Sequence, residues 1–445
     1  MTNHRLRSGS QLLVLMAVTI AACAQDAIPL TLRKAVEIAT APEGNTRVEL
    51  AREAIAQADA RRLQARAALL PNLDGTIGYQ DATRNLRAFG IQFPSIPGFA
   101  FSSFAGPFGI FDARSAVTQS VFDLASIRRY QTAKSTVETT KQERESVRHQ
   151  VTDQVARAYL AALRTEAHLE TAKANLELAQ RILRLTRSQK DAGTGTGIEV
   201  TRAEVQIANE KQRLQAAEND RNRAHLQLLR ALDMRLDAKL QLTDKLGYHV
   251  MEPVSYDQAL KAATDNRPDY RSQQQREASL KMQYRSVKSE RLPSLAAFAD
   301  YGTIGPAVND SRATRTVGVS LRVPVFDGGR RDARRAEAAS QLRAEEIRTR
   351  DVRQQLELEL RLAFDSLTSA ELQVATAEEG LRLAQKEFEQ AERRYKAGVT
   401  TSVEVTDAQT RMVRAQENRI SALFQHNLAR LDLGSAMGAV DRYLP

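Results

Sequence analysis

Residues that could perform enzymatic chemistry are few and scattered in this sequence. The six His residues stand apart, and no pair has the spacing of a His-Glu-x-x-His metal site. No Gly-rich phosphate loop followed by Lys is present, and the only cysteine, Cys23, lies at the end of a predicted export signal. The sequence therefore predicts a protein that is not an enzyme and that holds no metal and no cofactor.

Two carboxylates near the C-terminus form the charged pair with the most defined spacing. Glu404 and Asp407 stand three positions apart, so both can occupy one face of a helix. They follow Gly398, a residue type that commonly ends a helix. On their own these acids are typical of a first helical turn, where the helix dipole favours negative charge. Whether these two acids have a function depends on the helices and turns that position them.

The N-terminal segment has the pattern of a cleaved secretory signal. Two arginines precede an apolar stretch that ends in small residues, and residues 1–22 are the predicted signal peptide. Cleavage before Gln25 and cleavage before Cys23, with lipid attached to Cys23, both fit the residues around this boundary. Under either interpretation the mature chain leaves the cytoplasm and contains no disulfide.

Composition and charge restrict the fold and the partners. Aromatic residues make up 5% of the 445-residue chain and Trp is absent, which is typical of long helices and coiled coils. Beyond the signal, no segment reaches the roughly 18 to 20 apolar residues of a membrane-spanning helix. Acidic residues are interleaved with the basic ones that give the net charge of +10, so nucleic acid is not an expected partner.

The sequence contains two copies of one arrangement of helices and strands. The residues around Gly193 match those around Gly398, and this offset of 205 positions persists along the segments that follow. Leu-Pro and Phe-Asp pairs recur in the same order in both halves. They are Leu70-Pro71 and Phe122-Asp123, then Leu292-Pro293 and Phe326-Asp327. We therefore divide the chain into repeats at 23–246 and 247–445, each with a helix, two strands and two long helices.

Four long helices are predicted from segments that lack proline. The segment 124–192 also lacks glycine, and at 1.5 Å per residue it would extend roughly 100 Å. Within it, Leu169, Leu176 and Leu183 recur every seven residues, which is the spacing of a coiled-coil seam. The other candidates are 198–246, 330–397 and 399–433.

The segments between the Leu-Pro and Phe-Asp landmarks are richer in Gly, Thr, Val and aromatic residues, and they alternate with a period of two. They predict four strands, near residues 75–81, 115–122, 296–302 and 315–323. Residues 84–112 hold seven of the thirteen Phe together with several prolines, so we expect a long loop there. An extracellular lid, an interfacial anchor and a packed cap are the alternatives for this loop.

Four strands per chain leave two sheet edges whose backbone groups would be unpaired in lipid. Pairing between chains removes these edges, and three chains with twelve strands give the smallest closed sheet wide enough to conduct. The predicted fold is therefore mainly helical. A trimer shares a small transmembrane β-barrel above a long antiparallel coiled-coil tunnel.

The ordered set of landmarks resembles the TolC-like outer membrane efflux proteins over nearly all of the mature chain. The strongest likeness is Tyr395-Lys396-Ala397-Gly398 leading to Val-Glu-Val-Thr-Asp-Ala-Gln at 403–409. The resemblance implies a homotrimeric channel in the bacterial outer membrane, with lipid around its strands and a large periplasmic portion. It also implies docking to a periplasmic adaptor and an inner-membrane pump, in tripartite efflux or type I secretion.

Candidate site residues follow from the resemblance by motif position. Glu404 and Asp407 correspond to acids that line the periplasmic constriction, where threefold repetition would form carboxylate rings that favour cations. The two glycine turns correspond to the tips that meet the adaptor, with their hydroxyl groups expected to be exposed. These tip residues are Gly193, Gly398, Thr400, Thr401 and Ser402. The alternative function is a soluble periplasmic coiled-coil scaffold or adaptor, which would need no detergent.

Overall fold

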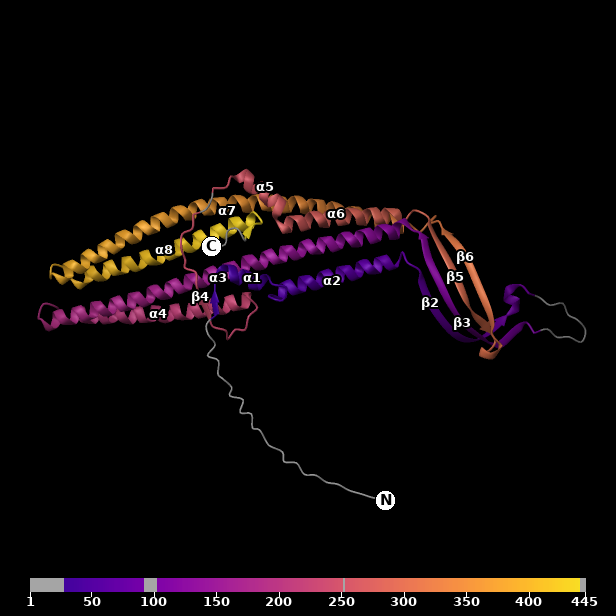
Figure 1. Cartoon of the computed structure of the whole chain (residues 1–445), viewed down its shortest axis with the longest axis horizontal. Coiled ribbons are helices and arrows are strands. Elements are labelled where there is room, and N and C mark those ends of the chain that lie inside the picture. The colour runs from indigo at the N-terminus through magenta and orange to yellow at the C-terminus, as the bar shows by residue number, and fades with distance from the viewer. Residues whose placement is uncertain (1–27, 92–101, 251–252, 441–445) are drawn as a thin grey trace, which may run out of the picture.

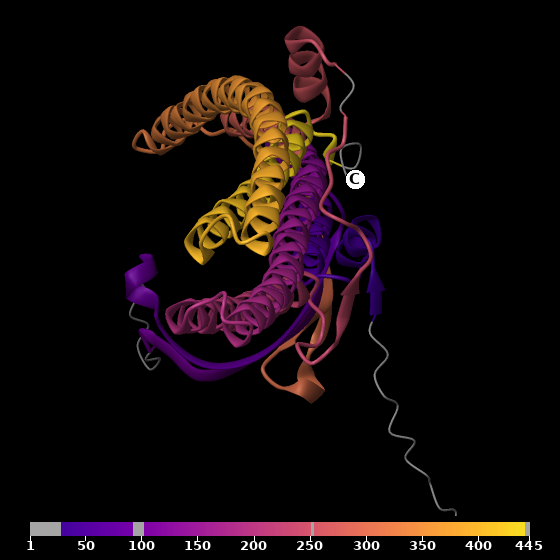
Figure 2. The same cartoon turned by 90° about the vertical axis from the view of Figure 1, so that its left-hand side faces the viewer.

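The computed structural model describes residues 28–91, 102–250 and 253–440. The chain is elongated, with helices over most of its length and a sheet at one end (Figure 1). In the end view the helical hairpins and the strands follow a common curve and form a wall, not a compact bundle (Figure 2). Residues 1–25, with the predicted signal and both predicted cleavage sites, lie outside the described ranges.

Two helices run from the sheet to the far tips, and each is accompanied by two shorter helices laid end to end (Figure 1). The bounds are Thr46–Ala67 for α2, Leu124–Asp191 for α3, Gly197–Ala231 for α4, Pro268–Ser289 for α6, Arg330–Lys396 for α7 and Ser402–Ala436 for α8. The long helices α3 and α7 have 68 and 67 residues, α2 and α6 have 22 each, and α4 and α8 have 35 each. These matching lengths confirm the predicted duplication. None of the described helices is both long enough and apolar enough to cross a bilayer.

The shorter helices meet end to end through two equivalent positions, 233 and 438, which are again 205 apart. Asp233 follows α4 with a φ of 55°, and its carboxylate accepts the Thr46 backbone N–H at 2.8 Å at the start of α2. Gly438 follows α8 with a φ of 71°, and a Cβ there would lie 2.8 Å from the backbone nitrogen of Arg267 at the start of α6. The helix predicted over 198–246 is therefore wrong beyond α4, because the chain turns at Asp233 to cap another helix.

The buried residues of α3 near the tips include Leu178 and three small side chains spaced by seven. Ala172, Ala179 and Thr186 are buried, whereas the predicted leucine stripe is only half-buried. The seven-residue period is therefore confirmed, but the predicted position of the seam is wrong by three residues.

Short elements gather around the middle of the helices. β1 (Ile28–Leu30) pairs in parallel with β4 (Leu240–Leu242), α1 (Leu32–Thr40) packs on α3, and α5 (Tyr256–Asn266) packs on α6 and α7. No repeat or motif in the sequence predicted the β1–β4 pair. It fixes the start of the described chain against the segment that follows α4.

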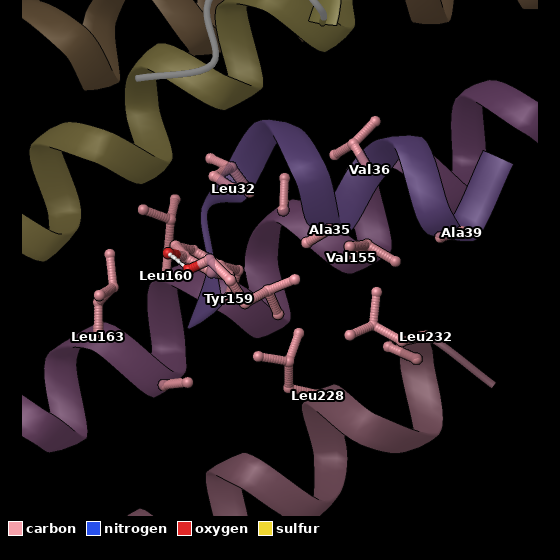
Figure 3. Close-up of a cluster of buried hydrophobic side chains, with 14 of the residues drawn as sticks. Leu32, Ala35, Val36, Ala39, Val155, Tyr159, Leu160, Leu163, Leu228 and Leu232 are labelled. Carbon is pink, nitrogen blue, oxygen red and sulfur yellow. Dashed lines mark hydrogen bonds between the residues drawn. The ribbon is translucent and has the colours of Figure 1, made fainter. Parts of the chain in front are cut away.

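Tyr159 of α3 lies at the centre of the largest buried cluster, among Val155, Leu160 and Leu228 (Figure 3). Its hydroxyl oxygen lies 2.8 Å from both the Leu30 carbonyl and Asp244 Oδ2, and these two acceptors share its single proton. Burial, together with these carboxylate contacts, raises the pKa of Tyr159, so the hydroxyl stays a donor. The buried hydrogen bonds hold β1 and the segment after β4 on one face of α3.

The four longer strands form one antiparallel sheet in the order β2-β3-β5-β6. Their bounds are Asn72–Asn85 for β2, Phe104–Phe122 for β3, Ser294–Gly305 for β5 and Arg312–Arg322 for β6. Each overlaps a predicted strand, and β3 begins well before its predicted start. A short turn, η2 (Val308–Asp310), joins β5 to β6.

The loop predicted over 84–112 is wrong at both ends. β2 continues to Asn85 and is followed by the turn η1 (Leu86–Phe89), while β3 already begins at Phe104 and includes Pro107. Pro107 is tolerated because the register between the two strands shifts beside it, where a bulge needs no donor from this residue. The remaining loop residues at 92–101, with three of the seven Phe, lie outside the described ranges.

Candidate functional site

Both hairpin tips end their first helix with the same hydrogen bonds. Gly193 and Gly398 have positive φ values of 76° and 73°. Each glycine donates its N–H to the carbonyl three residues earlier, and the next residue donates to the carbonyl five residues earlier, at 2.9 to 3.0 Å. This is a Schellman cap, in which glycine adopts the left-handed conformation without a Cβ clash. The duplication therefore places two equivalent turns at the end farthest from the sheet (Figure 1).

The acidic pair lies in the first two turns of α8, directly after the second tip. Glu404 accepts a hydrogen bond from the Thr400 hydroxyl, and its Oε1 lies 2.7 Å from Nη1 of Arg394 on the opposite side of the turn. Asp407 is exposed, and no cation in the described part of the chain pairs with it. Arg394 therefore offsets the charge of Glu404, whereas Asp407 presents its charge to solvent.

The predictions for this region omitted Arg394. The distance of Arg394 from the turn along the sequence is the signal that could have predicted its pairing with Glu404. Arg394 stands four residues before Gly398 and Glu404 six residues after it, so an antiparallel hairpin brings the two side chains face to face.

The hydroxyl groups at the second tip differ in exposure. Thr401 is exposed at the N-cap position of α8, and Thr400 is half-buried because it donates to Glu404. Ser402 is only 6% exposed, and its backbone N–H donates to Glu199 Oε1 at 3.4 Å. The predicted exposure of Ser402 is therefore wrong, since this residue faces the first hairpin.

Glu199 fastens the two hairpin tips together within one chain. It belongs to the capping box at the start of α4, where its Oε2 accepts the Thr196 N–H at 2.9 Å, and its other oxygen reaches Ser402. These backbone hydrogen bonds, the one from Thr196 first, lower the pKa of Glu199 against the opposing effect of burial. Nearby, the Gln189 side chain donates to the Tyr395 carbonyl at 3.2 Å. Glu199 stands 205 positions before Glu404 and is therefore its equivalent in the first repeat.

The strand register separates apolar from polar side chains on the two faces of the sheet. One row across all four strands is apolar and consists of Leu73, Val117, Ala299 and Val317. The next row, on the opposite face, consists of Asp74, Ala116, Asp300 and Thr316. Large apolar side chains that are exposed on the first face include Ile77, Tyr79, Tyr301 and Leu321. Such alternation is typical of a sheet that separates lipid from water.

Charged side chains on the polar face pair with one another. Arg114 lies 2.6 Å from Asp112 and 3.5 Å from Asp300, measured between guanidinium nitrogens and carboxylate oxygens. Gly302 makes room for this arginine, because a Cβ there would lie 2.4 Å from the Arg114 Cβ. Among the described residues, no three His, Cys, Asp or Glu side chains gather as metal ligands would.

Comparison with known protein families supplies the decisive observation. The sequence pattern described as outer membrane efflux protein matches residues 38–233 and 259–439, one segment in each repeat. The chain belongs to the outer membrane efflux protein family. The predicted resemblance to TolC-like channels is therefore confirmed.

Relatives with known roles share low sequence identity with this member of the family. The pyoverdine export outer membrane protein OpmQ of Pseudomonas aeruginosa is 23% identical over 390 residues, which cover 86% of this chain and 80% of that protein. The outer membrane efflux protein BepC of Brucella suis is 23% identical over 64% of this chain and 62% of its own length.

Solved channel structures share the fold. The CmeC outer membrane channel of Campylobacter jejuni has a TM-score of 0.77 at 17% identity, covering 92% of this chain and 86% of that one. The outer membrane protein VceC of Vibrio cholerae has a TM-score of 0.76 at 17% identity, covering 92% and 96%. The predicted fold class is thereby confirmed, with the helices as a tunnel wall and the strands as part of a sheet shared between copies.

Family membership also confirms the predicted function, location and partners. The chain is an outer membrane efflux channel with a large periplasmic portion, and it acts as a homotrimer with a periplasmic adaptor and an inner-membrane pump. Strands β2 and β6 are the sheet edges of one chain and are therefore available to neighbouring copies. The alternative function as a soluble periplasmic scaffold is not favoured, because the exposed apolar face of the sheet is suited to contact with lipid.

Proposed function

We propose that Glu404 and Asp407 line the narrowest part of this efflux channel, at the periplasmic end of its helical tunnel. The start of α8 lies at the end farthest from the sheet, which is the periplasmic end when the sheet is in the outer membrane (Figure 1). Repetition around the channel axis would form rings of carboxylates, which attract cations. The observation that carries this proposal is the exposed Asp407 carboxylate one helical turn from Glu404, paired with no described cation.

The two carboxylates are proposed to contribute unequally to ion selectivity. Arg394 forms an ion pair with Glu404 at 2.7 Å, so a ring of these pairs carries little net charge. A ring of Asp407 carries its full negative charge. Cation selectivity should therefore depend mainly on Asp407, and removal of Arg394 should increase it.

The two glycine turns are proposed as the surface that meets the periplasmic adaptor. Gly193, Gly398 and Thr401 are exposed at the tips, where no other described residue covers them. Thr400 is engaged with Glu404 and Ser402 is buried, so Thr401 is the hydroxyl of this group best placed to bind a partner. The left-handed glycines keep the turns narrow, which suits insertion between helices of another protein.

Transport through the channel is proposed to be passive and free of catalysis. The sequence contains no phosphate-binding loop, and the described residues contain no metal-ligand cluster. The polar face of the sheet and the acidic tip provide a path for solutes, and the inner-membrane pump would supply the energy.

Ion selectivity in planar bilayers tests the proposed constriction. The permeability ratio of potassium to chloride, measured from the reversal potential in a salt gradient, should favour potassium in the wild-type channel. Asp407→Asn should lower this ratio more than Glu404→Gln, because the Glu404 charge is already offset. Arg394→Gln should raise the ratio by exposing that charge.

A matched control is Asp365→Asn, which removes an exposed carboxylate from the middle of α7, far from the tip. This variant should keep the wild-type ratio. Wild-type selectivity in both Asp407→Asn and Glu404→Gln would place the constriction elsewhere. A protein that stays soluble without detergent and does not conduct would contradict the channel assignment itself.

A further inference from the structure

Exposed apolar side chains form a layer where the strands meet the helices. The four junctions, α2 to β2, β3 to α3, α6 to β5 and β6 to α7, lie at one level of the molecule (Figure 1). Val325 and Phe326 are 91% and 87% exposed, and Phe122 and Leu292 are about half-exposed at 49% and 47%. Side chains of this kind at one level fit the boundary between lipid chains and headgroups.

Cations lie directly beyond this apolar layer, at the ends of the helices. Arg66 is the penultimate residue of α2, Lys288 is the penultimate residue of α6, and Arg330 is the first residue of α7. All three are exposed, and no carboxylate of the described chain pairs with them. We name these three residues the junction cations.

The acidic side chains at the same level are already engaged. Asp332 pairs with Arg291, Glu290 lies 3.3 Å from Arg334, and Asp327 lies 3.5 Å from Arg331. Asp123 caps the N-terminus of α3, where it accepts the Ala125 N–H at 3.0 Å, and Asp74, two residues into β2, accepts the Asn72 amide at 2.7 Å on the polar face of the sheet. A neighbouring copy in the trimer presents the same residues at the same level, and there its carboxylates are engaged in the same way.

We propose that the junction cations bind the phosphate groups of anionic phospholipids in the periplasmic leaflet of the outer membrane. The inference rests on the assignment of the chain as an outer membrane channel. The apolar layer would lie among the acyl chains, and the long Lys and Arg side chains would extend to the headgroups. Juxtamembrane cations attract anionic lipid surfaces, each by about 1 kcal/mol, which corresponds to about a fivefold change in affinity.

Binding of phosphatidylglycerol to the purified trimer tests this proposal. The triple variant Arg66→Gln, Lys288→Gln, Arg330→Gln should bind phosphatidylglycerol roughly 100-fold more weakly than wild type, from about fivefold per cation. Native mass spectrometry during titration of the lipid gives the affinity. Added salt should weaken wild-type binding, because the contact is electrostatic. Phosphatidylcholine should bind wild type and variant equally weakly.

Two further triple variants keep the result interpretable. Arg181→Gln, Lys211→Gln, Arg350→Gln removes three exposed cations far from the sheet and should leave lipid binding unchanged. Exchanging Arg for Lys and Lys for Arg at the junction cations keeps the charge and should retain most of the affinity. Equal phosphatidylglycerol binding by wild type and the first triple variant would overturn the proposal.

Conductance of the same variants separates this inference from the channel function. The junction cations stand at the membrane surface and not at the tip, so the first triple variant should still form conducting trimers. Conducting trimers with unchanged lipid affinity would refute lipid binding alone. Loss of conductance in wild type as well would instead refute the channel.

Discussion

A buried histidine should make the middle of the tunnel sensitive to acid. His426 of α8 is 0% exposed, and neither of its ring nitrogens has a hydrogen-bond partner. The Tyr248 ring lies over it at a centroid distance of 4.6 Å, and the Asn427 amide donates to the Gly247 carbonyl at 2.9 Å. We name residues 243–250, which cross α8 here, the strap.

The charges around His426 all oppose its protonation. Burial is the largest effect, followed by Arg430 on the same helix and His249 on the strap, and together they lower the pKa of His426 to about 4. Asp244, the acid of the strap, raises the pKa of His249 and accepts no hydrogen bond from His426. The neutral imidazole is therefore the form that fits under the strap.

The sign of the pH effect follows from this lowered pKa. The exposed imidazole takes up a proton near pH 6.5, whereas the docked imidazole does so only near pH 4. The stabilisation is therefore fully present above pH 6.5 and is lost as the pH falls toward 4. Between about pH 8, where the imidazole is neutral in both states, and pH 5 the loss is about 2 kcal/mol, or roughly a 30-fold increase in strap opening, at 1.36 kcal/mol per pH unit.

Hydrogen–deuterium exchange of the strap amides, corrected for intrinsic exchange rates, measures this opening. His426→Leu should remove most of the pH dependence because it cannot take up a proton. His168→Leu is the matched control, since burial also lowers the pKa of His168 but this residue lies on α3 and not under the strap. The same pH dependence in wild type and His426→Leu would refute the reasoning.

Three further substitutions test the fold. Gly398→Ala should destabilise the channel by about 1 to 2 kcal/mol because the turn needs a positive φ, whereas Gly380→Ala, inside α7 with open space around it, should stabilise by about 0.5 to 1 kcal/mol. Thermal melting followed by circular dichroism compares the two variants. Equal shifts of the melting temperature would contradict the assigned turn. Tyr159→Phe should cost about 1 to 2 kcal/mol, since the Leu30 carbonyl and Asp244 lose the one buried hydroxyl donor that they share. If the β1 amides exchange hydrogen for deuterium at the same rate in this variant as in wild type, these hydrogen bonds do not hold β1.

The duplication made most of the fold predictable from the sequence. A constant offset between two glycine turns located all the long helices, because segments without proline and glycine can continue as helices for tens of residues. The same offset also relates Asp233 to Gly438, where the structure finds both helix ends. The prediction failed at Asp233 because an aspartate ends a helix there only through its contact with Thr46, a residue far away in the sequence.

The candidate site was predictable in position but not in charge. Spacing alone placed Glu404 and Asp407 on one helix, yet the ion pair with Arg394 depends on how the two helices face each other across the turn. The burial of Ser402 depends on the other hairpin in the same way. The spacing of residues along the sequence does not show which side chains meet across two helices.

The docking of β1 limits how far the N-terminal residues can reach. Leu30 is held by Tyr159, which stands 35 residues into α3 from the sheet, or about 50 Å along the helix. The chain from Cys23 to Ile28 can extend at most about 18 Å. While β1 stays paired with β4, we therefore expect residues before Ile28 to remain on the tunnel side of the membrane, unless a lipid attached at Cys23 draws β1 away from β4.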